Sequence, residues 1–269
     1  PLIQEVLLQH DQKKEPRLVS LYLNGDTSAV NPELTALIKQ WDHEAVRSSA
    51  GAGGKPYRRG RGGGAGTSSR QGSLKDSRNR PAARYAPKRW AVVDELDFLD
   101  MLPGIYFIFS RNGCDKAVEQ CMRAGLQLTG DSEARRIRRI VDSMTEGRIS
   151  RDDARALGFA NFRNALEQGI APHHAGMVAL YREIVEKLFE QGLLKIVFAT
   201  ETLALGINMP ARCVVVEKLE KFNGVSHETL SPGEFTQLTG RAGRRGIDSV
   251  GYAIVVDHRD FEPSTAAAL

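Results

Sequence analysis

Long apolar runs are missing from the 269-residue sequence. No stretch approaches the roughly 18 to 20 apolar residues of a membrane span, and no charged-then-apolar leader opens the chain. We therefore expect a cytoplasmic protein without a membrane segment. Cysteine is scarce as well: Cys114, Cys121 and Cys213 are odd in number and lack C-x-x-C spacing, so we expect reduced packing residues and no metal site.

A phosphate-cradling loop is also lacking, since the pattern G-x-x-x-x-G-K-[ST] occurs nowhere. The run Trp90–Asp97, WAVVDELD, ends in Asp-Glu like the metal-binding strand of an ATPase. Its apolar residues, continued to Leu99, follow helical spacing instead, so the sequence predicts an amphipathic helix there. We expect that this chain alone does not hydrolyse a nucleotide.

The positive charge is confined to one segment. The formal net charge is +4, but residues 51–89 carry eleven Lys and Arg against the single Asp76, so the remainder is acidic. Nine glycines and hardly any aliphatic side chains predict a flexible basic insertion over residues 49–89. Two interpretations stay open: a solubilising spacer, or an Arg/Gly-type nucleic-acid-binding arm with Tyr57 and Tyr85 available for stacking.

Four apolar runs predict the sheet. They cover residues 105–109, 195–199, 213–217 and 252–256 and alternate with helical patterns that begin at residue 115 and cover 126–168 and 177–191. This order predicts an α/β fold, a parallel β-sheet with helices on both faces. Before it, residues 18–23 read as a strand, and residues 32–46 as a helix capped by Asn31.

Polar residues directly after the predicted strands are the first candidate ligand contacts. Ser110 and Arg111 follow one strand, and Thr200 and Thr202 follow another. Ligands of open α/β sheets gather at the carboxyl ends of strands. Hydroxyls at the start of a helix suit a backbone phosphate of a nucleic acid.

The densest chemistry lies in residues 231–246, SPGEFTQLTGRAGRRG. Ser231 and Glu234 form a capping box that predicts a helix start. Gln237, Arg241 and Arg244 follow at i, i+4 and i+7, which predicts one helical face cleared by glycines. Arginine forks suit a polyphosphate; the alternative is a solvated basic helix end.

These stretches resemble a known family. Residues 231–246 resemble motif VI of superfamily-two helicases, in the form of the superkiller-type DExH branch and closest to its bacterial group. FSR at 109–111 resembles motif IV, and TETLALGINMP at 200–210 resembles motif V. GIAPHHAG at 169–176 resembles the motif between them.

The resemblance implies the second RecA-like domain of an ATP-dependent RNA helicase, a P-loop superfold without its own P-loop. ATP would meet Gln237, Arg241 and Arg244, with Gly206 and Asn208 on the nucleotide side, and Mg²⁺ would be held by an absent first RecA domain in cis. Nucleic acid, single-stranded RNA or a 3′-tailed duplex, would meet eight residues: Ser110, Arg111, His174, Ala175, Gly176, Thr200, Thr202 and Phe222. DNA stays possible, because motifs IV and V contact the backbone.

The resemblance also divides the chain. Residues 1–48 would form a connecting arm packed on the RecA-like domain of residues 90–257, and residues 258–269 a tail toward a missing winged-helix domain. Residues 218–230 would form a strand-separating β-hairpin, with a plain loop as the alternative. Of the adjacent histidines 173 and 174, we expect one to be buried and the other near the RNA path, with no metal between them. The rival class is a non-catalytic RNA-binding module on the same fold.

Overall fold

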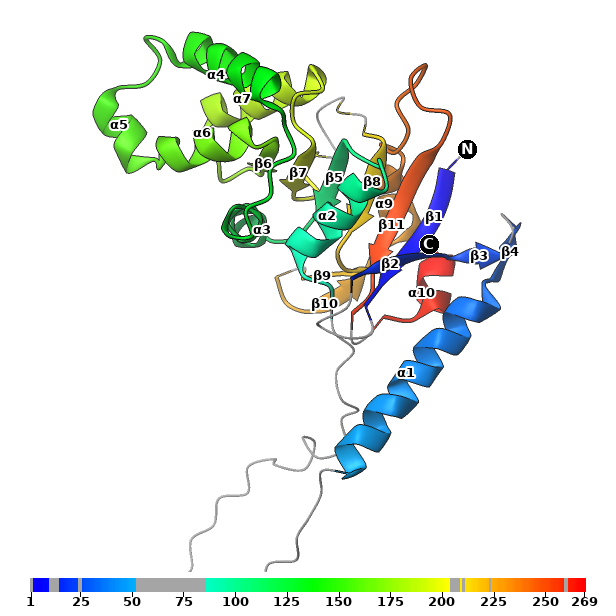
Figure 1. Ribbon diagram of the computed structural model, residues 1–269. Coiled ribbons are helices and arrows are strands. Elements are labelled where there is room, and N and C mark those ends of the chain that lie inside the picture. Colours follow the sequence, from blue (N-terminus) through cyan, green and yellow to red (C-terminus); the bar gives the residue numbers. More distant parts are fainter. Residues whose placement is uncertain are drawn as a thin grey trace, which may run out of the picture.

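The computed structural model describes residues 2–9, 15–23, 26–51, 86–203, 209, 211–222, 224–258 and 261–269 (Figure 1). Most of the predicted basic insertion, residues 52–85, therefore lies outside the described residues. Gly206 and Asn208, the predicted nucleotide-side residues of motif V, lie outside them too.

A seven-stranded sheet forms the centre, in the order β2-β1-β11-β8-β5-β7-β6. All neighbours in it are parallel except β1 and β2. The strands are β1 (Leu2–Leu8), β2 (Arg17–Ser20), β5 (Gly104–Phe107), β6 (Ile170–His173), β7 (Ile196–Ala199), β8 (Cys213–Val216) and β11 (Gly251–Val256). The predicted parallel α/β fold is confirmed.

Two strands of the central sheet were not predicted from the sequence. β1 lies between β11 and β2, so the segment before α1 (Pro32–Gly51) extends the sheet itself. β6 occupies part of the stretch that resembles the motif between IV and V. The predicted strand at 18–23 is divided at Leu21 into β2 and β3 (Tyr22–Leu23), and β3 pairs with β4 (Asp26–Val30).

Alternate side chains of each strand enter two separate cores. Ile105 and Phe107 point to the face covered by α7 (Ala179–Glu190) and α9 (Pro232–Thr239). Tyr106 and Ile108 point to the opposite face, covered by α2 (Arg89–Phe98) and α3 (Arg111–Arg123). α2 confirms that the run ending in Asp-Glu is helical and buries Val92, Val93 and Leu96.

The remaining elements lie around this sheet (Figure 1). α4 (Asp131–Thr145), α5 (Arg151–Ala156) and α6 (Phe159–Glu167) form a lobe beside β6, as the helical pattern predicted. A two-stranded hairpin of β9 (Glu220–Phe222) and β10 (His227–Thr229) follows β8, so a hairpin and not a plain loop is present. Its strand-separating role stays a prediction. α10 (Pro263–Ala267) closes the chain. No helix within the described ranges has the length and apolar character to cross a bilayer.

Candidate nucleic-acid and nucleotide interfaces

The carboxyl ends of β5, β7 and β6 bring three distant stretches to one edge of the sheet. Because the strands are parallel neighbours, the residues after them emerge side by side. The Ile108 N–H donates to the Ala199 carbonyl at 2.8 Å, and the Thr200 N–H donates to the His173 carbonyl at 3.3 Å. We call this row of residues 110–111, 174–176 and 200–202 the carboxyl edge.

Ser110 and Arg111 form one part of the carboxyl edge. The Ser110 hydroxyl accepts a hydrogen bond from the Gly113 N–H at 3.1 Å and so caps α3. Arg111, the first residue of α3, is exposed. A Cβ atom on Gly176 would stand 3.3 Å from the Cδ of Arg111, so the two predicted RNA contacts are neighbours.

The two adjacent histidines are both buried, as expected for one of them. The position of the other near an RNA path stays a prediction. His173 Nε2 lies 2.8 Å from Glu186 Oε1, and His174 Nε2 lies 3.0 Å from Asp115 Oδ1. Burial lowers the pKa of His173, against the opposing effect of Glu186, so the ring is neutral at pH 7. From this stretch, the exposed Ala175 and Gly176 are left to face a ligand.

The hydroxyls of Thr200 and Thr202 lie 2.9 Å apart and share a hydrogen bond. Thr202 is exposed and Thr200 is partly so. Phe222 projects from β9 with 58% of its surface exposed, and its ring centroid lies 5.3 Å from that of His227. These side chains offer hydroxyl donors and an unburied aromatic ring, the groups that hold a single strand.

Motif VI begins as predicted but does not continue as one helix. The Ser231 hydroxyl accepts from the Glu234 N–H at 3.3 Å, and Glu234 Oε2 accepts from the Ser231 N–H at 2.9 Å. However, α9 ends at Thr239, so the predicted single helical face of Gln237, Arg241 and Arg244 is wrong. Gly243 has a φ of 90°, a backbone turn that a continuing helix excludes.

The chain after α9 is fixed to the end of motif V. The Ala211 N–H donates to the Arg241 carbonyl at 2.9 Å, and the Gly243 N–H donates to the Ala211 carbonyl at 2.7 Å. Gly251, the first residue of β11, is pressed against this loop. A Cβ atom at Gly251 would lie 2.6 Å from the backbone of Ala242 and Gly243, so only glycine fits.

Arg244 is oriented by a carboxylate that the sequence did not single out. Its Nε and Nη2 donate to the two oxygens of Asp248, each at 2.8 Å, and its backbone N–H donates to Asp248 at 2.9 Å. Hydrogen bonding to Arg244 lowers the pKa of Asp248. Within the described chain Nη1 makes no hydrogen bond, whereas Nε and Nη2 are both occupied by Asp248. Gln237 is exposed, and burial lowers the pKa of the half-buried Arg241.

Lys221 of the hairpin links both candidate interfaces. Its Nζ lies 3.2 Å from Glu201 Oε2, between the two threonines of motif V, and also pairs with Glu234 of the capping box. Lys221 and Ser231 together lower the pKa of Glu234 to about 2. The sequence placed Lys221 in a hairpin, but ion pairs between distant segments have no sequence pattern.

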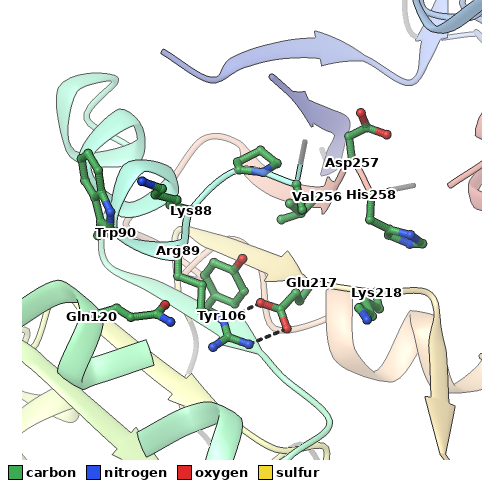
Figure 2. Close-up of a pocket in the computed structure, with 12 residues that line it drawn as sticks. Lys88, Arg89, Trp90, Tyr106, Gln120, Glu217, Lys218, Val256, Asp257 and His258 are labelled. Atoms are coloured by element: carbon green, nitrogen blue, oxygen red, sulfur yellow. Dashed lines mark hydrogen bonds and ion pairs between the residues drawn. The ribbon is translucent and has the colours of Figure 1, made fainter. Parts of the chain in front are cut away.

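A cavity of about 550 Å³ lies beside the carboxyl edge (Figure 2). At its centre Arg89 and Glu217 form a bidentate ion pair, with Nε–Oε1 at 2.6 Å and Nη2–Oε2 at 3.0 Å. Arg89 Nη1 also donates to the Gly113 carbonyl at 3.3 Å, next to the cap of α3. The chain that returns from residues 52–85 is therefore attached beside Arg111.

Comparison with known proteins gives a consistent picture. The helicase conserved C-terminal domain matches residues 128–246. The chain is 53% identical over 190 residues to the probable helicase HelY of Mycobacterium tuberculosis, a match that covers 71% of this chain and 21% of the relative. It is 47% identical over 247 residues to the probable helicase HelY of Mycobacterium leprae, covering 91% of this chain and 25% of that protein.

A more distant relative is the antiviral helicase SKI2 of Saccharomyces cerevisiae, 36% identical over 170 residues, which cover 63% of this chain and 13% of that protein. The chain thus spans at most about a quarter of the length of these relatives.

Proposed function

Because the chain belongs to the superkiller-type branch of superfamily-two helicases, we propose that it is the second RecA-like half of an ATP-dependent RNA helicase. In this proposal it contacts the γ-phosphate of ATP with one surface and single-stranded RNA with another. The observation that carries the proposal is the pair of backbone hydrogen bonds that join Ala211, the residue directly after motif V, to Arg241 and Gly243 of motif VI. Through these hydrogen bonds, a ligand bound at either surface can affect the backbone of the other.

The phosphate surface consists of Gln237, Arg241 and Arg244. Two guanidiniums and a carboxamide on a glycine-cleared loop fit the oxygens of a polyphosphate. Asp248 occupies two N–H groups of Arg244, which leaves the Nη1 edge for a phosphate oxygen. ATP with Mg²⁺, held by the first RecA domain, supplies the phosphoryl group, and the arginines stabilise the charge that develops on it.

The RNA surface is the carboxyl edge together with Phe222. Arg111 supplies a cation and Thr200 and Thr202 supply hydroxyl donors, all suited to backbone phosphates. The buried ring of His174 makes no direct contact; it accepts the Gly176 N–H at 3.2 Å and so shapes the loop that does. Phe222 at the hairpin would stack on a base at the junction with a duplex.

A non-catalytic RNA-binding module on the same fold is the competing function. The bidentate support of Arg244 by Asp248 favours the enzyme, since it orients a guanidinium that is not among the residues proposed to bind RNA.

Fluorescence anisotropy of a labelled oligouridine tests the RNA surface of the 269-residue chain. Arg111→Ala should weaken binding and reduce the slope of log affinity against log salt by about 0.7, the value for one single-strand phosphate contact. Arg148→Ala is the matched control, because that exposed arginine lies between α4 and α5, outside the carboxyl edge, and pairs with Glu183 of α7. Equal losses of affinity in the two variants would contradict the assignment of Arg111 to the RNA surface. The same titration with oligothymidine compares RNA with DNA.

The phosphate surface needs the full-length protein. ATP turnover there should fall on Arg241→Ala, whereas the 269-residue chain alone should show no turnover. Turnover by this chain above an Arg241→Ala, Arg244→Ala control would overturn the assignment of the hydrolytic machinery to the first domain.

A further inference from the structure

The cavity beside the carboxyl edge belongs to neither surface assigned so far. It is lined by the chain entering α2, by α3 and by the ends of β8 and β11 (Figure 2). Its volume of about 550 Å³ is within the range of small-molecule sites. Its wall combines three cations with two carboxylates: Lys88, Arg89 and Lys218 against Glu217 and Asp257.

Tyr106 provides a polar group without a partner. The side chain is fully buried, lines the cavity, and its hydroxyl makes no hydrogen bond to any residue that the structure describes. Burial and the nearby Glu217 raise the pKa of Tyr106 well above its usual value, so the phenol keeps its proton and remains a donor. Buried hydroxyls nearly always have a partner, and an acceptor on a ligand would supply one.

The two lysines provide charge on opposite sides of Tyr106 (Figure 2). Lys88 and Lys218 are exposed and form no ion pair within the described residues, whereas Glu217 is already neutralised by Arg89. Trp90 lies beside Lys88 and is half-buried. An aromatic face, a hydroxyl donor and free cations together match a nucleotide, since bases stack on aromatic rings and phosphates take cations and donors.

The sheet order extends the RNA surface toward this cavity. β8 is the parallel neighbour of β5, and β11 is the neighbour of β8, so their ends continue the row that holds Arg111. Adjacent strands lie about 4.8 Å apart, which sets the cavity within about 10 Å of that row. β9 of the hairpin begins two residues after Lys218.

We propose that this cavity binds one nucleotide of the RNA strand, with its base on Trp90, its phosphate at the lysines and an oxygen accepting from Tyr106. That the nucleotide belongs to an RNA strand rests on the proposed function. The cavity chemistry itself fits any nucleotide that carries a phosphate. A free mononucleotide is the alternative source.

Tryptophan fluorescence gives a direct readout, because the chain has only two tryptophans. In a Trp41→Phe background Trp90 is the single emitter. Titration with oligouridine should quench it at the concentrations where anisotropy reports binding, and uridine monophosphate should quench it only at far higher concentration. If the mononucleotide quenches equally well, the occupant is a free nucleotide and the RNA source is overturned.

Two variants test the polar contacts. Tyr106→Phe removes only the hydroxyl, so thermal stability should not fall, while oligouridine affinity should drop about fivefold, the value of one hydrogen bond. Lys218→Ala should reduce the salt slope by about 0.7, as expected for one phosphate contact.

The outcomes separate this inference from the proposed function. Binding that responds to Arg111→Ala but leaves Trp90 emission, the Tyr106→Phe affinity and the Lys218→Ala slope unchanged overturns the cavity site alone. Binding that is insensitive to Arg111→Ala while Trp90 is still quenched overturns the RNA surface and retains the nucleotide site.

Discussion

Replacing Arg244 should affect stability as well as catalysis. Arg244→Ala removes the two side-chain hydrogen bonds to Asp248 and keeps the one from the backbone N–H. The Asp248 side chain, only 6% exposed, would be left charged without its cation. Each hydrogen bond to a charged group contributes about 1.5–3 kcal/mol to stability. Removing one partner of a fully buried ion pair costs about 3–5 kcal/mol. Since Arg244 is 24% exposed and water can partly replace it, we expect a loss of about 2 kcal/mol in the free energy of unfolding.

The pH dependence of this loss has a definite sign. Arg244 lowers the pKa of Asp248 in the folded protein, so the pair stabilises the fold above the ordinary aspartate value of 3.8 and less as the pH falls through the lowered pKa. The difference in unfolding free energy between the wild type and Arg244→Ala should therefore be full at pH 7 and shrink below about pH 4. Urea denaturation of both proteins at pH 7 and below about pH 4 measures this difference.

A double variant separates the two roles of Arg244. Arg244→Ala with Asp248→Ala removes the stranded carboxylate, so most of the lost stability should return. ATP turnover of the full-length protein should stay about 10³-fold reduced in both variants, the lower value for an arginine finger. If the double variant regains turnover, Arg244 acts only on folding and its role at the γ-phosphate is refuted. If it stays as unstable as the single variant, the stranded charge is not the cause.

Three further changes test other contacts. Lys221→Met should raise the pKa of Glu234 from about 2 toward the usual value, which NMR titration measures. It should also reduce the number of strands unwound per ATP in the full-length protein, and unchanged unwinding would reject Lys221 as a link between the two interfaces. Gly251→Ala should displace the motif VI backbone and lower the melting temperature by several degrees, because its Cβ would meet backbone at 2.6 Å. Thr200→Ala should weaken oligouridine binding and spare basal ATP turnover, whereas an equal loss of both would place Thr200 elsewhere.

The sheet was largely predictable because buried parallel strands are continuous apolar runs. Ile105 to Phe107 and Val214 to Val216 have no exposed surface and follow that pattern. β6 escaped prediction because Pro172 and His173 interrupt its apolar character, although all four of its residues are buried. Its burial depends on neighbours on both sides, which only the assembled sheet supplies.

The candidate site was predictable in its residues but less so in its geometry. Motif spacing identified Arg241 and Arg244, and the capping box identified the start of α9. The path of the chain after that helix involves Gly251, the first residue of β11, whose missing side chain leaves room for the Ala242 backbone. Asp248 likewise belongs to no motif, because only the turn after Gly243 brings it to the guanidinium.

The pairing of β1 with β11 has a consequence for how the chain is made. Leu2 pairs with Gly251 and Leu7 with Val256, so the interior position of β1 stays vacant on one side until the last strand has been synthesised. Val6, Leu7 and Leu8 are fully buried in the folded protein, so they stay without their neighbouring strand β11 until it has been synthesised. The loop that this pairing closes is so long that its exact length has little effect. Removing residues 52–85 would change the entropic free-energy cost of closing it by only about 0.1 kcal/mol. A long insertion at that point therefore adds little to the cost of closing the sheet.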